Sequence, residues 1–251
     1  MFRVSIEKCA SILQETKSLD RPLIDLLYSQ SIEPELIRQT RYAQPCLFAI
    51  EYALIQLYRS WGVVPDAICG HSLGEYVAAV AAGRMSLEDG LVLVAKRAKL
   101  MDELCSDGHS MVSVFHSEAA VLRAMEDLEP SQREQVAIAC INGPSSVVLS
   151  GNAEAVANVQ SILGGAFKEL FVSHAFHSPL MQPILGQFRA MLDQLPDDGP
   201  MGCDDIRFVS CLRGGGQTLG PEHWIRHVCD PVDFNSAMAQ LAHECSVFVE
   251  I

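Results

Sequence analysis

The first hundred positions combine helical apolar spacing with one short apolar run. Over residues 42–60, large apolar side chains recur at helical spacing and predict a buried amphipathic helix: Leu47, Ile50, Leu54 and Leu57. The run Asp66–Gly70 predicts a short buried strand. Residues 72–82 are rich in alanine and valine and are followed by Gly83, which predicts a helix directly after that strand.

A second long helix is predicted from residue 86 onward. Ser86 is a typical helix N-cap residue. An apolar stripe follows it at steps of three and four residues: Leu87, Leu91, Val94, Ala98 and Met101. This spacing places one face of the helix in a core.

The pattern changes after Asp107-Gly108. Strands are predicted over 111–116, 136–141, 146–150 and 167–173, and helices over 117–128 and 153–163. Strand-helix-strand-strand-helix-strand is the ferredoxin-like order. We therefore expect a ferredoxin-like subdomain over residues 108–173, inserted into a larger α/β domain made of residues 1–107 and 174–251.

The last part of the chain again alternates helices and strands. It predicts helices over 179–195, 221–229 and 232–243, and strands over 207–211 and 246–251. Strands that alternate with helices in the outer segments imply a mainly parallel sheet. The expected fold class is α/β.

Composition narrows the partners and the compartment. The 251 residues are 49% hydrophobic and carry a net charge of −13, which argues against nucleic acid or an anionic membrane as partner. The nine cysteines are scattered without a CxxC pair, as is typical of free thiols in a reducing compartment. The N-terminal segment is too polar for a signal peptide, and no apolar run has membrane length, so we expect a cytoplasmic protein.

The strongest chemical signal is Gly70-His71-Ser72-Leu73-Gly74, a GxSxG sequence between a predicted strand and a predicted helix. A serine on such a turn presents its hydroxyl at the sheet edge, and the glycines let strand and helix approach. The Leu73 N–H, at the helix N-terminus, is the natural oxyanion donor. The alternative is a chance match in a glycine-rich turn, against which the strand-turn-helix context argues.

A serine nucleophile needs a base, and His177 is the best placed of the eight histidines. Ser178 and Pro179 are typical of an N-cap and a first helical residue, so His177 directly precedes a helix N-terminus. The positive end of that helix disfavours the imidazolium and keeps His177 able to accept the serine proton. For any single histidine, a core or surface imidazole is the alternative.

Five stretches resemble the acyltransferase domains of modular polyketide synthases, which are related to malonyl-CoA:acyl-carrier-protein transacylases. They run in the family's order along the chain: YAQPCLFAIEYAL, SWGVVPDAICGHSLGEYVAA, INGPSSVVLSG, VSHAFHSPLM and HWIRHVCDPVDF. The resemblance implies transfer of malonyl from coenzyme A to the phosphopantetheine thiol of an acyl carrier protein through an acyl-serine, in polyketide or fatty-acid biosynthesis. It also implies an α/β-hydrolase-like core, without a bound cofactor or a metal.

The resemblance assigns roles to three residues. Ser72 matches the nucleophile, His177 its base, and Arg97 the arginine that grips the free carboxylate of malonyl. A guanidinium suits that task, because it binds a carboxylate through two parallel hydrogen bonds. The alternative for Arg97 is a solvated helix charge, since Lys96 and Lys99 flank it.

Further expected contacts also come from the resemblance. The sequence HAFH, His174 to His177, is the variant associated with malonyl-selecting members. Phe176 would crowd the α-carbon that carries a methyl group in methylmalonyl, and Leu73 fits the same preference. Asn142 begins a hairpin that lies near the active-site mouth in the family, and His71 precedes the nucleophile. We expect His71, Asn142, His174 and Phe176 to contact substrate.

Three other histidine and acid positions need an interpretation. Family members steady their histidine with a backbone carbonyl instead of a carboxylate, and we align Asp233 with the residue that supplies it. His223 and His227 are four apart on a predicted helix, a spacing that can bind a metal. No third ligand lies near them in the sequence and the family uses no metal, so we expect a structural role.

The sequence departs from the family at both ends. The family begins with a strand and a glycine- and glutamine-rich loop that gives a second oxyanion donor, whereas Met1-Phe2-Arg3 matches the following helix. The chain stops at Ile251, before the family's glycine-proline-glycine turn. We expect a domain truncated at both ends, from a longer chain with ketosynthase and linker domains.

Two other classes remain as alternatives. A serine hydrolase or thioesterase of α/β type would want an acidic residue between Ser72 and its histidine in chain order, and it gives no reason for Arg97. An inactive fragment of an acyltransferase explains the truncation, but not the presence of Ser72, Arg97 and His177 together.

Overall fold

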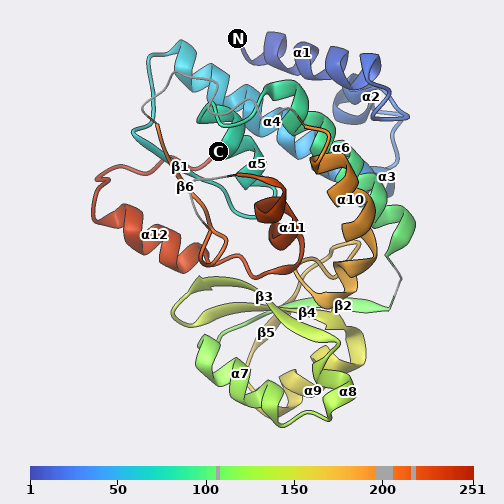
Figure 1. The fold of residues 1–251 in the computed structure, drawn as a ribbon, viewed down its shortest axis with the longest axis vertical. Helices are drawn as coiled ribbons and strands as arrows, with labels where there is room; N and C mark the ends of the chain where they lie inside the picture. Colours follow the sequence, from blue (N-terminus) through green and yellow to red (C-terminus); the bar gives the residue numbers. More distant parts are fainter. Residues whose placement is uncertain (106–107, 196–205, 216–218) are drawn as a thin grey trace.

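The computed structural model describes residues 1–105, 108–195, 206–215 and 219–251 (Figure 1). Its larger part consists of helices around a parallel pair of strands, and its smaller part is built on a four-stranded antiparallel sheet. The α/β class is confirmed. Parallel pairing is less extensive than expected: among the described residues it joins the strands β1 (Ala67–Cys69) and β6 (Arg207–Val209), and beyond them one isolated bridge, Cys140 to Val232. The boundary between the two parts was predicted at residues 107–108. Asp107 lies outside the described residues, and Gly108 begins the next described range.

Six helices come from the first 105 residues: α1 (Phe2–Glu15), α2 (Leu23–Tyr28), α3 (Pro34–Arg38), α4 (Thr40–Ser60), α5 (Gly74–Ala81) and α6 (Leu87–Leu104). Helices α4 and α6 pack along each other, and α1 packs against both. Their shared core contains Phe48, Tyr76 and Leu91, each completely buried.

Helix α4 is present as predicted, but its buried side is not the predicted one. Leu47 is 49% exposed, whereas Phe48, Ala49 and Ala53 are completely buried. The cause is that α1, α5 and α6 contact α4 from several directions, so small residues make the close contacts. Leu47 and Ile50 instead border a pocket.

Helix α6 follows its prediction closely. The Ser86 side chain accepts a hydrogen bond from the Asp89 N–H at 3.0 Å, which caps the helix. All but the first residue of the predicted apolar stripe are buried: Leu91, Val94, Ala98 and Met101. The same buried side carries Arg97.

The smaller part contains seven elements: β2 (His109–Val114), α7 (Glu118–Glu126), α8 (Pro130–Arg133), β3 (Val136–Gly143), β4 (Ser146–Asn152), α9 (Ala153–Leu163) and β5 (Phe167–Glu169). The strand order is β3-β4-β2-β5, with every pair antiparallel. Helix α8 was not predicted. Strand β5 ends earlier than expected, and the nearby Phe171 is 96% exposed.

Both faces of this antiparallel sheet are covered. One face packs against α7 and α9 through residues such as Val112 and Leu149. The other face, which includes Ala139 and Val148, packs against the larger part. Burial on both sides explains why β3 and β4 are almost continuously apolar in sequence. Backbone hydrogen bonds from Ile141 N–H to the Val232 carbonyl (2.8 Å) and from Val232 N–H to the Ala139 carbonyl (2.9 Å) join the parts.

The C-terminal region differs from prediction in two places. Residues 179–195 form a 3-10 helix, η1 (Pro179–Ile184), and then α10 (Leu185–Leu192), because Pro183 cannot donate a backbone hydrogen bond inside a longer α-helix. Helices α11 (Pro221–Cys229) and α12 (Phe234–Ala242) follow as expected. The strand predicted over 246–251 is absent; those residues are irregular, and no described strand offers them a partner.

Two properties expected from the composition can be compared with the structure. Within the described ranges, no helix has the length and apolar character that crossing a membrane requires. Eight cysteines lie in these ranges, and all eight are free thiols. The ninth, Cys203, lies outside the described residues.

Candidate active site

Ser72 lies on a tight turn between β1 and α5, as predicted. Its φ angle is 51°, in the left-handed region that non-glycine residues adopt only when the surrounding structure imposes it. A Cβ atom at Gly70 would lie 2.1 Å from the backbone of Gly74, so this close approach requires glycine. At Gly74, a Cβ would be 3.6 Å from the Glu51 carboxylate, an ordinary contact. Only the first glycine of the motif is sterically required.

The Leu73 N–H lies at the start of α5, where backbone amides have no acceptor within the helix. The next amides are engaged: Gly74 donates to the His71 carbonyl at 3.0 Å, and Glu75 to the Ser72 carbonyl at 2.9 Å. Within the described part of the chain, Leu73 N–H has no hydrogen-bond acceptor. It can therefore donate to an oxyanion beside Ser72.

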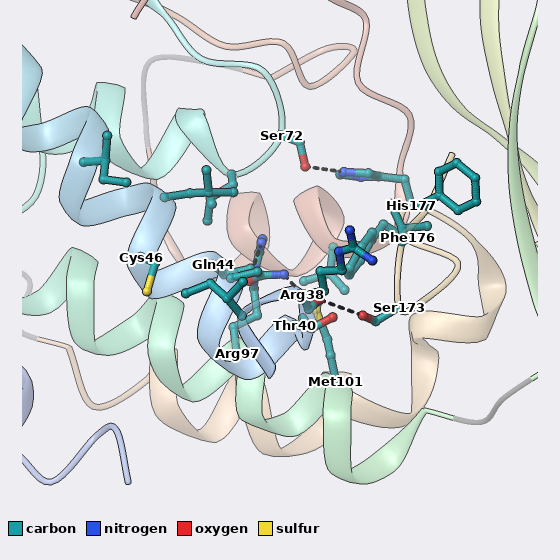
Figure 2. A pocket seen from close by; sticks show the side chains of 18 of the residues that line it. Arg38, Thr40, Gln44, Cys46, Ser72, Arg97, Met101, Ser173, Phe176 and His177 are labelled. Atoms are coloured by element: carbon teal, nitrogen blue, oxygen red, sulfur yellow. Dashed lines mark hydrogen bonds between the residues drawn. The ribbon is translucent and has the colours of Figure 1, made fainter. Parts of the chain in front are cut away.

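Ser72 and His177 are brought together from distant parts of the chain. The Ser72 Oγ and the His177 Nε2 are 2.7 Å apart, and Figure 2 shows this hydrogen bond at the end of a pocket. The His177 Nδ1 lies 3.1 Å from the Asp230 carbonyl oxygen. Because a carbonyl can only accept, Nδ1 carries the proton and Nε2 is free to accept from the serine hydroxyl.

The carbonyl that holds His177 belongs to Asp230, and the alignment with Asp233 was wrong. Asp230 is the C-cap of α11, where helix geometry leaves carbonyl groups without partners. Asp233 instead caps α12, accepting from the Ser236 N–H at 3.1 Å, and pairs with Arg213 at 3.0 Å.

Burial and a neighbouring positive charge favour the neutral form of His177. Burial lowers the pKa of its imidazole to about 3, and the nearby positive charge of Arg97 is the second cause. The segment after His177 begins with a six-residue 3-10 helix, η1, in place of the predicted α-helix. His177 also has a positive φ angle, 54°, so both members of the pair occupy strained backbone positions.

Arg97 is buried, with 3% of its surface exposed, so it is not a solvated helix charge. Its Nε and Nη2 donate to the Gln44 Oε1 at 3.2 and 2.9 Å, and its guanidinium lies 4.8 Å from the centre of the Tyr76 ring. In the parts of the chain described, no carboxylate pairs with Arg97. Gln44 was missed, although it lies in one of the five resembling stretches; a glutamine within the apolar helix pattern was the available signal.

One pocket connects these groups. It has a volume of about 490 Å³ and is bordered by Ser72, Leu73, Arg97, Phe176 and His177. Figure 2 shows Ser72 and His177 at one end and the Arg97–Gln44 pair deeper in the cavity. Both a nucleophile with its base and an uncompensated cation therefore face the same space.

Three predicted substrate contacts lie beside this pocket and do not border it. His71 Nε2 is 2.8 Å from Asn142 Oδ1, which links the nucleophile turn to the end of β3. His174 is buried, and its Nδ1 is 2.8 Å from the Thr40 Oγ1. The centre of the His174 ring is 6.0 Å from that of Phe176. His174 therefore packs near a residue of the pocket wall and does not border the pocket itself.

His223 and His227, whose spacing could bind a metal and for which we expect a structural role, are both buried beside Glu75. His223 Nε2 donates to Glu75 Oε1 at 2.9 Å, and the two imidazole rings are 6.2 Å apart. Over the ranges described, no group of three or more histidine, cysteine or acidic side chains is arranged to hold a metal ion.

These features define an α/β protein with a serine–histidine pair at a strand-turn-helix junction, the class that can form acyl-serine intermediates. The chain belongs to the acyl transferase domain family, which it matches over residues 1–251. Polyketide synthase GfsA of Streptomyces halstedii is 41% identical to it over 261 residues, which cover 100% of this chain and 3% of that protein.

Solved acyltransferase domains have the same fold. The domain from the second module of the salinomycin polyketide synthase is 36% identical, with a TM-score of 0.84, covering 96% of this chain and 54% of that one. The acyltransferase domain of SpnD, solved in complex with 2-(pent-4-yn-1-yl)malonyl, is 31% identical, with a TM-score of 0.82 and coverages of 97% and 56%. The chain thus spans about half of these solved chains.

The buried imidazole of His177 predicts acid sensitivity. Its pKa is lowered from 6.5 to about 3, so the unfolded chain binds one more proton than the folded chain between these values. As the pH falls through this window, the free energy of unfolding should decrease by up to about 1.4 kcal/mol per pH unit from this group. His177→Gln should reduce that slope in urea unfolding measured at several pH values. His243→Gln, at an exposed histidine, is the matched control; equal slopes for wild type and His177→Gln would contradict the prediction.

Proposed function

We propose that this domain transfers a malonyl group from coenzyme A to a carrier protein through an ester on Ser72. The observation that carries this proposal is the position of Arg97. This buried cation borders the same pocket as the Ser72–His177 pair, and among the described residues no carboxylate pairs with it. A desolvated guanidinium favours an anionic ligand strongly, and a carboxylate matches its geometry. An acyl thioester that ends in a carboxylate can place its thioester carbonyl at Ser72 and its carboxylate at Arg97.

The first half of the reaction acylates the serine. Ser72 Oγ attacks the thioester carbonyl while its proton passes to His177 Nε2. The Leu73 N–H stabilises the negative charge that develops on the carbonyl oxygen. The C–S bond then breaks, and the coenzyme A thiolate takes the proton from His177 as it leaves.

The second half reverses the roles. The phosphopantetheine thiol of an acyl carrier protein gives its proton to His177 and attacks the ester carbonyl. The C–O bond to Ser72 breaks, and His177 returns the proton to Ser72 Oγ, which regenerates the resting pair. No cofactor takes part in this scheme; malonyl-CoA is the substrate and the carrier's phosphopantetheine is the acceptor.

The hydrolase alternative is less well supported by the geometry. In a Ser-His-Asp triad, a carboxylate orients the base. Here a backbone carbonyl, that of Asp230, accepts the hydrogen bond from the Nδ1–H of His177. The family membership and the position of Arg97 both favour transfer of a dicarboxylic acyl group over hydrolysis.

The context of the domain is part of the proposal. Its relatives are modular polyketide synthases, which supports a polyketide line over a fatty-acid line and neighbouring ketosynthase and linker domains. We assign residues 108–173 to a ferredoxin-like subdomain and residues 1–107 and 174–251 to the catalytic subdomain, in a cytoplasmic protein. The support is the βαββαβ order, with β2 and β4 at the centre of the sheet.

Ser72→Ala tests the nucleophile. Incubation with malonyl-CoA should add the mass of one malonyl group to the wild-type protein, because Ser72 Oγ is hydrogen-bonded to the base and can form the ester. The variant should show no adduct by intact-protein mass spectrometry. A full-size adduct on Ser72→Ala would place the nucleophile elsewhere.

Arg97→Ala should change which acyl groups are accepted. Malonyl transfer should fall at least about ten-fold, as expected for loss of a charge-assisted hydrogen bond, while acetyl-CoA, which has no carboxylate, should react as well as or better than before. Single-turnover acylation with each thioester measures both. Lys99→Ala, an exposed cation on the same helix, is the control. Equal losses with the two thioesters would make Arg97 structural.

Phe176→Ser should weaken the choice of malonyl over methylmalonyl. Phe176 borders the pocket beside His177, and a smaller side chain leaves space for the extra methyl group. Exclusion of one methyl corresponds to roughly a ten- to two-hundred-fold preference. Competition between the two thioesters at equal concentration should show malonyl preference in the wild type and a smaller ratio in the variant. A wild-type preference for methylmalonyl would refute the assignment.

A further inference from the structure

Glu75 is a fully buried carboxylate close to the nucleophile. It lies three residues after Ser72 in the first turn of α5, and none of its surface is exposed. Its Oε1 accepts from Ser210 Oγ at 2.7 Å and from His223 Nε2 at 2.9 Å. Its Oε2 accepts from the Cys211 N–H at 3.0 Å. A buried carboxylate without such partners would be strongly destabilising, so these three contacts are necessary to keep it inside.

The donors to Glu75 come from two elements that are distant in sequence from α5. Ser210 and Cys211 directly follow β6, the strand that pairs with β1, and His223 lies in α11. The carboxylate therefore fixes α5 against both the exit of the parallel sheet and helix α11. Among the described residues, the polar side-chain contacts that join α5 to α11 are those of Glu75 with His223 and His227.

Helix α11 also holds the base. Its C-cap residue, Asp230, provides the carbonyl that accepts from His177 Nδ1 at 3.1 Å. Between Glu75 and His177 lies His227, whose ring meets that of His177 at 5.9 Å, edge to face. His227 Nε2 is 3.8 Å from Glu75 Oε2. Ser72 therefore lies directly before α5, the helix that carries Glu75. The carbonyl that holds His177 lies at the end of α11, the helix that contains the histidines in contact with Glu75.

We propose that Glu75 is a positioning residue that sets the 2.7 Å contact between Ser72 and His177 by fixing α5 against α11. The inference rests on the proposed function only in that Ser72 is the nucleophile. Glu75 does not border the pocket of Ser72 and Arg97, so it acts on the nucleophile–base geometry and not on substrate binding. Its loss should slow the reaction of Ser72 without weakening capture of the malonyl carboxylate.

Glu75→Gln is the sharpest variant, because it keeps the shape and changes one oxygen to an NH2 group. With the NH2 group facing the Cys211 N–H, two donors oppose each other and that hydrogen bond is lost. With the amide turned over, the Ser210 hydroxyl and the His223 imidazole must both reverse from donating to accepting, and in either orientation the charged acceptor is gone. Glu75→Asp keeps the charge but shortens the reach, and His223→Gln removes a partner from α11. Glu88→Gln makes the same chemical change at an exposed glutamate in the first turn of α6 and serves as the matched control.

Two readouts separate positioning from binding. The rate at which a fluorophosphonate labels Ser72 reports activation of the hydroxyl without any malonyl group. Single-turnover acylation with malonyl-CoA gives a maximal rate and a half-saturating concentration. Glu75→Gln should lower the labelling rate and the maximal acylation rate together, by about a hundred-fold, as for a reactive group displaced by roughly 1 Å. The half-saturating concentration of malonyl-CoA should be unchanged, and Glu88→Gln should match wild type in every measurement.

Several outcomes would overturn the proposal. Wild-type labelling rates in Glu75→Gln, measured below its melting temperature, would show that the carboxylate only stabilises the fold. A rise in the half-saturating concentration with a normal maximal rate would place Glu75 in substrate binding. If Glu75→Gln does not fold, normal labelling in both Glu75→Asp and His223→Gln would refute the link. A wild type that is labelled but takes no malonyl would refute the proposed function, while the labelling comparison would still decide the role of Glu75.

Discussion

The burial of one guanidinium, with no counter-ion among the residues that the structure describes, is the constraint on which the site depends. Arg97 receives only a neutral oxygen from Gln44 and the face of Tyr76 in the described structure. Neither compensates a full positive charge. That residual charge prepares the pocket for an anion, and it also helps to lower the pKa of His177, which keeps the base neutral. The proposed substrate choice and the neutral state of the base thus share one cause.

The base, His177, is held by a backbone carbonyl, which carries no net charge. A carboxylate at Nδ1 would stabilise the imidazolium, whereas the Asp230 carbonyl fixes the tautomer with a weaker field. Because burial and Arg97 disfavour the charged ring as well, the pair is a modest proton acceptor. A transferase has to keep its acyl-serine intact against water until a thiol arrives, and a weak base is suited to that requirement.

Local features of the site could be predicted from the sequence, and contacts between distant segments could not. The turn at Ser72 and the helix cap at Ser86 depend on neighbouring residues and were found. The carbonyl of Asp230, the glutamine that holds Arg97 and the partners of Glu75 depend on how α4, α5, α6 and α11 meet in space, and no local spacing encodes that. The same holds for α4, whose buried side was set by its neighbours, and for residues 246–251, whose apolar pattern found no pairing strand.

The antiparallel sheet of the smaller part has apolar residues on both faces, and this limits how the molecule can be divided. One face, with Ala139 and Val148, is closed by residues of the larger part such as Val232 and Leu241. Separating the two parts would expose that apolar face to water and would break the backbone hydrogen bonds at Val232. For chimeric synthases, the smaller part is therefore a poor unit of exchange by itself: a graft of this part should include the segment at Val232 and the surface of α12 that covers the sheet.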